Sequence, residues 1–119
     1  MATKKLYYSW QQFDKDIKKI ARRIKRTNKR FDGIFGPPRG GLPVAVALSH
    51  QLNLPLFLKP KSKRTLIVDD ISDTGKTLKP YAKNYFIATI FYRKQSAVSP
   101  AIWIRKKTNK WIVFPWEKS

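Results

Sequence analysis

Apolar residues recur along this chain at helical spacings in some segments and as short continuous runs in others. Ser9 precedes a segment whose apolar residues step by four and three positions, which predicts an amphipathic helix capped by that serine: Phe13, Ile17, Ile20 and Ile24. Small and branched residues at 42–52 predict a second helix that packs on a sheet. Short segments rich in β-branched and aromatic residues predict strands at residues 31–36, 54–58, 65–68, 85–92 and 101–105.

The remaining segments connect these elements. The sequence predicts a tight basic turn at 59–64 and a loop at 69–75. It also predicts a brief helix that contains a proline at 76–84 and an aromatic tail at 111–117. Strands that alternate with helices predict an α/β fold, with a doubly wound, mostly parallel sheet flanked by helices. We expect one domain over residues 1–119.

Two loops after predicted strands are rich in polar and glycine residues. GPPRGG (36–41) follows the first strand, and DDISDTGKT (69–77) follows the third. Ligands of open parallel sheets bind beyond the carboxyl ends of the strands. We therefore expect both loops to lie at the same edge of the sheet.

Composition adds a strong charge imbalance. The 26 Lys and Arg residues against 7 Asp and Glu give a net charge of +19, which attracts polyanions such as nucleic acid or a substrate with several phosphates. A solvated lysine-rich surface explains the same charge, so a nucleic-acid partner is compatible with it but not favoured. No apolar run approaches the roughly 20 residues of a membrane span, and no cysteine is present for disulfides or thiolate metal sites. We expect a cytoplasmic protein.

Asp69, Asp70 and Asp73 place three of the seven acidic residues close together in this basic chain. Neighbouring carboxylates at a sheet edge can accept hydrogen bonds from vicinal hydroxyls or hold a divalent metal. The turn at 73–77 leads into a predicted helix. We expect its backbone N–H groups, the hydroxyls of Thr74 and Thr77, and the helix N-terminus to form an anion-binding site together. Acceptors for a diol beside a phosphate site predict binding of a ribose 5-phosphate.

Three other interpretations of this loop are weaker. A nucleotide-binding P-loop needs glycine five positions before Gly75, where Asp70 stands. A phosphate-accepting receiver domain would carry the acid pair on its first strand, whereas this pair lies past the middle of the chain. An ordinary acidic turn that caps a helix does not require a pattern this long.

Residues 65–78 (TLIVDDISDTGKTL) resemble the phosphoribosyl-diphosphate (PRPP) binding motif of the type I phosphoribosyltransferases. The resemblance covers nearly the whole chain and is closest to the small xanthine–guanine–hypoxanthine branch. Residues 31–43 resemble its pyrophosphate loop, 88–93 the strand that leads to the purine, and 111–117 its base-stacking segment. The resemblance implies the type I fold and transfer of a 5-phosphoribosyl group from PRPP to a 6-oxopurine (guanine, xanthine or hypoxanthine), a reaction of purine salvage.

The resemblance also implies roles for individual residues. The catalytic acid or base facing the purine would be Asp73, while Asp69 and Asp70 would hold the ribose hydroxyls and, directly or through water, Mg²⁺. The implied PRPP-binding set is Arg39, Gly40, Asp69, Asp70, Asp73, Thr74, Gly75, Lys76 and Thr77. The implied purine-binding set is Trp111, which would stack on the base, the backbone of Ile112, and Arg93. We expect Trp116 to pack in the core or at a subunit interface.

The chain also departs from the family pattern. Relatives usually carry a long flexible lid where this chain has only residues 59–64, and they tend to place a lysine where Arg93 stands. The pyrophosphate loop of the family usually contains a non-proline cis peptide bond. Two alternatives to an active transferase therefore stay open: a lidless regulator that binds PRPP or a nucleotide, and a nucleic-acid-binding protein on the same fold. We expect a homo-oligomer, either a dimer or a tetramer.

Overall fold

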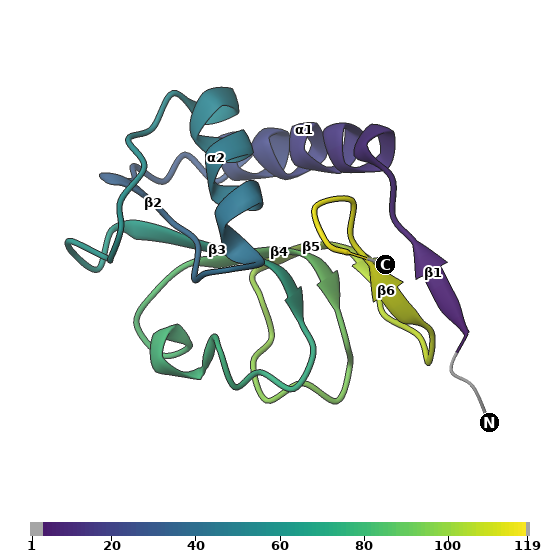
Figure 1. Ribbon diagram of the computed structural model, residues 1–119. Helices are drawn as coiled ribbons and strands as arrows, with labels where there is room; N and C mark the ends of the chain where they lie inside the picture. The colour runs from purple at the N-terminus through teal and green to yellow at the C-terminus, as the bar shows by residue number, and fades with distance from the viewer. Residues whose placement is uncertain (1–3, 119) are drawn as a thin grey trace.

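The computed structural model describes residues 4–118, in which a four-stranded parallel sheet has the strand order β2-β3-β4-β5 (Figure 1). Strands β1 and β6 form a separate two-stranded parallel sheet. The elements are β1 (Lys5–Tyr7), α1 (Trp10–Arg26), β2 (Gly33–Phe35), α2 (Gly41–Leu52), β3 (Thr65–Ser72), the 3₁₀ helix η1 (Lys79–Tyr81), β4 (Ile87–Tyr92), β5 (Ile102–Lys106) and β6 (Trp111–Val113). The predicted α/β fold with a parallel sheet is confirmed.

Both α-helices cover the same face of the four-stranded sheet, with α2 over β2 and β3 and α1 over β4 and β5 (Figure 1). The helix α1 begins as predicted, because Ser9 Oγ accepts a hydrogen bond from the Gln12 backbone and the Gln12 side chain accepts one from the Ser9 backbone. Its apolar stripe is buried against the sheet, including Ile17 and Ile20. This packing fixes the side of the sheet on which the main core lies.

The opposite face of the sheet has a smaller core. Phe35, Ile67 and Ile87 project from the strands on this side, and the segment around η1 covers them with Leu78. The brief helix predicted at 76–84 is shorter than expected, because only the three residues of η1 are helical and they form a 3₁₀ turn. Pro80 explains the difference, since it lacks the N–H that would continue an α-helix.

Two strand predictions also need correction. Residues 54–58 do not form a strand, because Leu56 makes only an isolated bridge to Ile34; Pro55 lacks an N–H, which limits pairing. Strand β3 runs four residues past its predicted end at Val68, because Ile71 and Ser72 pair with Phe91 and Tyr92 of β4. Asp69 and Asp70 therefore lie within β3 and not in the loop that follows it.

A buried carboxylate connects α1 to the edge strand β5. Asp16 is fully buried in α1, and its Oδ2 atom accepts hydrogen bonds from the hydroxyl of Tyr8 and from Nε of Arg105, the latter at 2.7 Å. Burial, together with the Asp16 carboxylate, raises the pKa of the Tyr8 hydroxyl. Since Arg105 belongs to β5, this network fixes α1 relative to the end of that strand.

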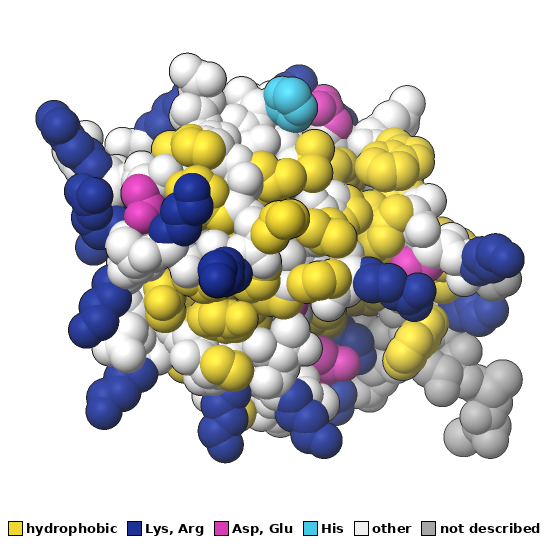
Figure 2. All heavy atoms as spheres, turned by 60° about the vertical axis from the view of Figure 1, so that its left-hand side comes forward, with side chains coloured by type: hydrophobic (Ala, Val, Ile, Leu, Met, Phe, Trp, Pro, Cys, Tyr) yellow, Lys and Arg dark blue, Asp and Glu magenta, His cyan; other side chains and the backbone are white. Residues whose placement is uncertain are grey.

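The connection from α2 to β3 is short, at residues 53–64, and contains no lid. Figure 2 shows the face on which this connection lies: hydrophobic side chains gather at its centre, and most of the Lys and Arg side chains lie towards its edges. Exposed apolar residues of α2 and the following connection are Val46, Leu56 and Leu58. The expected homo-oligomer stays a prediction. None of the helices in residues 4–118 has the length and apolarity that crossing a bilayer requires.

Candidate active site

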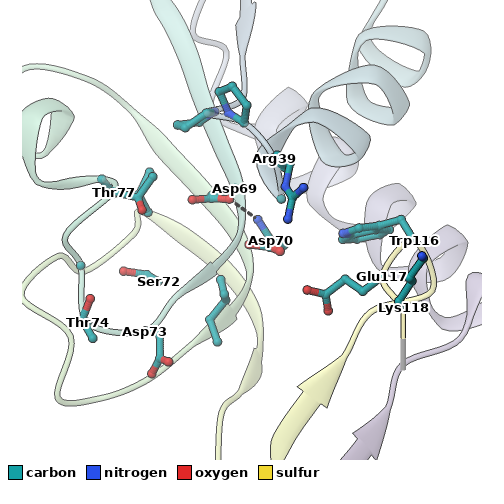
Figure 3. Close-up of a pocket in the computed structure, with 16 residues that line it drawn as sticks. Arg39, Asp69, Asp70, Ser72, Asp73, Thr74, Thr77, Trp116, Glu117 and Lys118 are labelled. Carbon is teal, nitrogen blue, oxygen red and sulfur yellow. Dashed lines mark hydrogen bonds between the residues drawn. The ribbon is translucent and has the colours of Figure 1, made fainter.

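The two loops selected from the sequence meet at one cavity of about 900 Å³ (Figure 3). The loop between β2 and α2 contributes residues 37–40, and the end of β3 with the following turn contributes most of residues 69–78. Residues 116–118 line it from the C-terminal segment. The cavity thus lies at the carboxyl edge of the parallel sheet, where both loops were expected.

Two adjacent carboxylates lie at the centre of this cavity. Asp69 is 5% exposed, and its Oδ1 accepts a hydrogen bond of 2.9 Å from the backbone N–H of Asp70. Burial is the main reason why the pKa of Asp69 rises to about 9, and the neighbouring Asp70 adds to it. Burial also raises the pKa of Asp70. Within residues 4–118, no Lys or Arg nitrogen lies within 4.0 Å of either carboxylate.

The loop between β2 and α2 approaches the acid pair with its backbone. A Cβ atom added to Gly40 would overlap the Asp70 carboxylate, so any other residue at this position would displace the Asp70 side chain. The peptide bond between Pro38 and Arg39 is cis, as the family resemblance implies for the pyrophosphate loop. The Arg39 side chain lies near Asp70 and Trp116 at the mouth of the cavity (Figure 3).

The turn after β3 has the conformation of a tight loop. Gly75 adopts a φ of +90° and is buried, and a Cβ there would lie 2.9 Å from the backbone nitrogen of Val98. Thr74 and Thr77 are exposed and line the cavity. Because no α-helix follows this turn, the predicted contribution of a helix N-terminus to anion binding is wrong. The hydroxyls and the backbone of the turn are the groups available to a phosphate.

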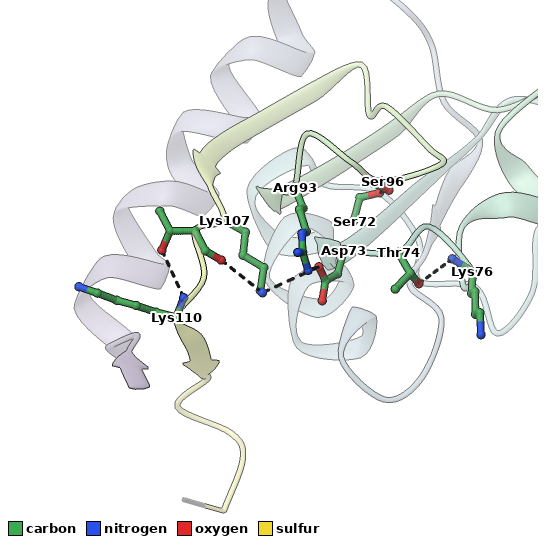
Figure 4. A network of polar contacts seen from close by, with 9 residues as sticks. Ser72, Asp73, Thr74, Lys76, Arg93, Ser96, Lys107 and Lys110 are labelled. Atoms are coloured by element: carbon green, nitrogen blue, oxygen red, sulfur yellow. Dashed lines mark hydrogen bonds and ion pairs between the residues drawn. The ribbon is translucent and has the colours of Figure 1, made fainter. Parts of the chain in front are cut away.

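Asp73 is held at the edge of the cavity by two basic residues (Figure 4). Its Oδ1 atom lies 3.3 Å from Nη1 of Arg93 and 3.9 Å from Nζ of Lys107. Arg93 follows β4 directly, and Lys107 follows β5. The predicted acid or base and the predicted purine ligand Arg93 are therefore in direct contact.

The structure places the predicted residues in two groups. All predicted PRPP ligands except Lys76, which is exposed, line the cavity. The predicted purine ligands do not line it: Trp111 is 61% exposed at the start of β6, and Ile112 is buried in the core. The aromatic side chain at the cavity is Trp116 instead, which also stacks on Phe114 at a centroid distance of 5.0 Å. Its packing was expected, but its place in the cavity was not.

Glu117 and Lys118 also line the cavity without having been predicted. Glu117 is fixed by a hydrogen bond of 2.9 Å from the backbone N–H of Phe114 to its side chain. Residues 111–117 were assigned to the base by their resemblance to the base-stacking segment of the family, without a role for Glu117 itself. The chain beyond β6 folds back and brings these two residues to the cavity. No local pattern in the sequence predicts this path.

Comparisons with known proteins agree with this geometry. Residues 4–63 match the family model of the phosphoribosyl transferase domain. The chain is 36% identical to a purine phosphoribosyltransferase from Pyrococcus horikoshii OT3, with a TM-score of 0.83 over 97% of this chain and 95% of that one. Two further structures show the same fold at lower identity. The xanthine-guanine-hypoxanthine phosphoribosyltransferase of Helicobacter pylori is 19% identical, with a TM-score of 0.82 over 95% of this chain and 94% of that one.

The other is a hypothetical protein from Neisseria gonorrhoeae with bound ppGpp, which is 17% identical, with a TM-score of 0.80 over 99% of this chain and 92% of that one. The family-model match ends before β3, whereas the likeness to the Pyrococcus structure extends over 97% of this chain. Together with the cavity, these findings show that the chain belongs to the phosphoribosyltransferase family.

Proposed function

We propose that this protein transfers a 5-phosphoribosyl group from PRPP to a 6-oxopurine, which yields a nucleoside monophosphate and pyrophosphate. One observation supports this most strongly: a buried pair of carboxylates, a threonine-rich turn and an arginine–glycine loop line the same cavity. The carboxylates can accept hydrogen bonds from ribose hydroxyls. The turn can donate hydrogen bonds to a phosphate, and the arginine–glycine loop can donate them to a pyrophosphate. PRPP carries all three groups on one sugar.

The positions of these residues support a role for each of them in binding PRPP. Asp69 and Asp70 accept hydrogen bonds from the two ribose hydroxyls, and the turn at 73–77 binds the 5-phosphate through its backbone and hydroxyls. Arg39 and the backbone at Gly40 bind the pyrophosphate. Gly40 lies directly against Asp70, so the pyrophosphate and ribose subsites are adjacent, as they are in PRPP itself.

The acid pair also fits Mg²⁺. Its ligands are carboxylate oxygens, which this ion prefers, and burial without a nearby cation raises the pKa of both groups, so a bound cation would favour their ionised form. Residues 4–118 contain no group of three or more His, Cys, Asp or Glu side chains that could hold a metal. Mg²⁺ would therefore bind through Asp69 and Asp70 together with substrate oxygens and water, and it would offset the charge of the leaving pyrophosphate.

The transfer itself requires little covalent chemistry from the protein. A base nitrogen forms the bond to ribose C1 while the bond from C1 to the pyrophosphate oxygen breaks, and the pyrophosphate leaves with the bonding electrons. Asp73 accepts the proton that the base loses. The protein aligns the two reactants and stabilises the leaving charge with Arg39.

Base selection depends on the groups beside Asp73. Arg93 carries only hydrogen-bond donors, which suit the oxygen of a 6-oxopurine and oppose the amino group of adenine. Trp111 and the Ile112 backbone remain the proposed contacts for the ring, with Trp116 as the aromatic residue already at the cavity. We expect guanine, hypoxanthine or xanthine to be accepted and adenine to be refused.

The experiment is to incubate the protein with PRPP, Mg²⁺ and each of guanine, hypoxanthine, xanthine and adenine, and to measure the mononucleotide. A double variant, Asp69→Asn with Asp70→Asn, should lose donor binding. Asp14→Asn is the matched control, because Asp14 is an exposed acid of α1 that pairs only with Lys18 among residues 4–118. The absence of product with every base, or adenine as the best acceptor, would refute the proposal.

A second candidate function is a sensor that binds PRPP or a nucleotide without turnover. The short connection at 53–64 favours it, because the cavity has no lid to exclude water. The Neisseria protein of the same fold holds ppGpp, a guanine nucleotide with two diphosphate groups. Calorimetry that detects tight binding of PRPP or a guanine nucleotide, in a protein that forms no product, would favour the sensor.

A further inference from the structure

Lys107 differs from the other lysines of this basic chain. Its side chain is 10% exposed, and it is the only lysine in residues 4–118 that is not in the exposed class. A lysine is rarely removed from water unless its charge is compensated. Its ammonium lies 3.9 Å from Asp73 Oδ1 and donates a hydrogen bond of 3.4 Å to the carbonyl of Thr108. The partner of this enclosed charge is thus the proposed acid or base.

The backbone of the sheet brings Asp73, Arg93 and Lys107 together. Each is the first residue after its strand, and the three strands β3, β4 and β5 are parallel neighbours. The backbone N–H of Arg93 bonds to the carbonyl of Ser72 at 3.0 Å, and that of Lys107 bonds to the carbonyl of Tyr92 at 2.9 Å. The three side chains therefore start from fixed points in a row at the carboxyl edge of the sheet (Figure 4).

Both basic side chains meet the same carboxylate oxygen. Arg93 and Lys107 approach Asp73 Oδ1, and no hydrogen bond or ion pair to Oδ2 is formed within residues 4–118. The Arg93 side chain is 40% exposed, whereas the Lys107 side chain is only 10% exposed. The arrangement leaves Oδ2 for a proton from the base while Oδ1 stays fixed.

We propose, on the basis of the function proposed above, that Lys107 is a positioning residue for Asp73. When Arg93 turns to donate to the 6-oxo group of the purine, its contact with Asp73 is lost. Lys107 then keeps Oδ1 in place and compensates the negative charge that Asp73 would otherwise bear alone. The carboxylate stays oriented to accept the proton that the base nitrogen releases as its bond to ribose C1 forms.

The test compares Lys107→Met, Lys107→Arg and the control Lys106→Met in the full chain, with steady-state kinetics for PRPP and hypoxanthine. Lys106 is the neighbouring residue of β5 and its side chain is exposed. Lys107→Met should lower kcat by about 10- to 100-fold, the usual result of a misplaced catalytic group. The KM for PRPP should stay within about two-fold, because Lys107 acts on the base side of the reaction. Lys107→Arg should restore most of kcat, and Lys106→Met should match the wild-type protein.

Two results would overturn this role: an unchanged kcat in Lys107→Met, or an equal loss in Lys106→Met. A loss in Lys107→Met that Lys107→Arg does not reverse would also contradict it, since a charge at this position should suffice. If Lys107→Met does not fold, Lys107→Gln keeps a donor without the charge and should show the same loss of kcat. A wild-type protein without turnover refutes the proposed function instead, so the two failures can be distinguished.

Discussion

Replacing Asp69 with Asn should stabilise the ligand-free protein above neutral pH and flatten the pH dependence of its free energy of unfolding. Burial and the neighbouring Asp70 raise the pKa of Asp69 from 3.8 to about 9. The unfolded chain releases this proton near pH 4, whereas the folded protein keeps it until about pH 9. Between these values the unfolded state binds fewer protons, so stability falls as pH rises.

The magnitude follows from this one proton. A single group that stays protonated only in the folded state changes stability by about 1.4 kcal/mol per pH unit. Between about pH 5 and about pH 8, the wild-type protein should therefore lose up to about 4 kcal/mol through Asp69. Asn has no proton to lose, and its amide oxygen can still accept the 2.9 Å hydrogen bond from the Asp70 backbone. The difference in free energy of unfolding between Asp69→Asn and the wild-type protein should therefore grow by about 4 kcal/mol from about pH 5 to about pH 8.

Urea unfolding followed by tryptophan fluorescence, without Mg²⁺ or ligand, measures this difference. The free energy of unfolding is determined at both pH values for the wild-type protein, for Asp69→Asn and for the exposed control Asp14→Asn. The control should follow the wild-type protein. If Asp69→Asn shows the wild-type pH dependence, then Asp69 is ionised in the folded protein and the account of its burial is wrong.

Three further predictions concern the cavity and its supports. Asp73→Asn should abolish nucleotide formation yet leave PRPP binding largely intact, as measured by calorimetry; an equal loss of affinity would place Asp73 on the donor. Gly40→Ala should weaken PRPP binding by about tenfold or more, because its Cβ would overlap the Asp70 carboxylate; wild-type affinity would show that this loop moves freely. Ser62→Ala should destabilise the protein by about 1 kcal/mol at neutral pH, because Ser62 donates to Asp32. That hydrogen bond lowers the pKa of Asp32, so the stability lost in Ser62→Ala is present above about pH 4 in the wild-type protein and disappears below it; a constant difference across pH would contradict this.

Local patterns were sufficient to predict much of the fold. The apolar spacing after Ser9 and the capping serine itself predicted α1, and the structure forms the capping box. The alternation of strands and helices predicted the parallel sheet. The rule that ligands bind at its carboxyl edge predicted that the loops at 36–41 and 69–77 lie together, as they do in the cavity. Both signals are local, because each depends on neighbouring residues and on strand direction alone.

Several features that the sequence did not predict depend on contacts distant in sequence. Strand β1 pairs with β6, which lies about a hundred residues later, and its short sequence has no strand signal of its own. Strand β3 extends past Val68 because β4 provides partners for its last residues, so the acid pair lies in a strand. Lys107 was one lysine among many in the sequence, and only the register of β5 against β4 places it beside Asp73.

The central claim is that this cavity transfers the ribosyl group of PRPP to a purine. Phosphorus NMR of PRPP with Mg²⁺, hypoxanthine and the protein tests it most directly, because donor, nucleotide, pyrophosphate and ribose 5-phosphate give separate signals. We predict that a nucleoside 5-monophosphate and pyrophosphate appear in equal amounts as PRPP disappears. Unchanged PRPP, or its hydrolysis to ribose 5-phosphate without any nucleotide, would contradict the account.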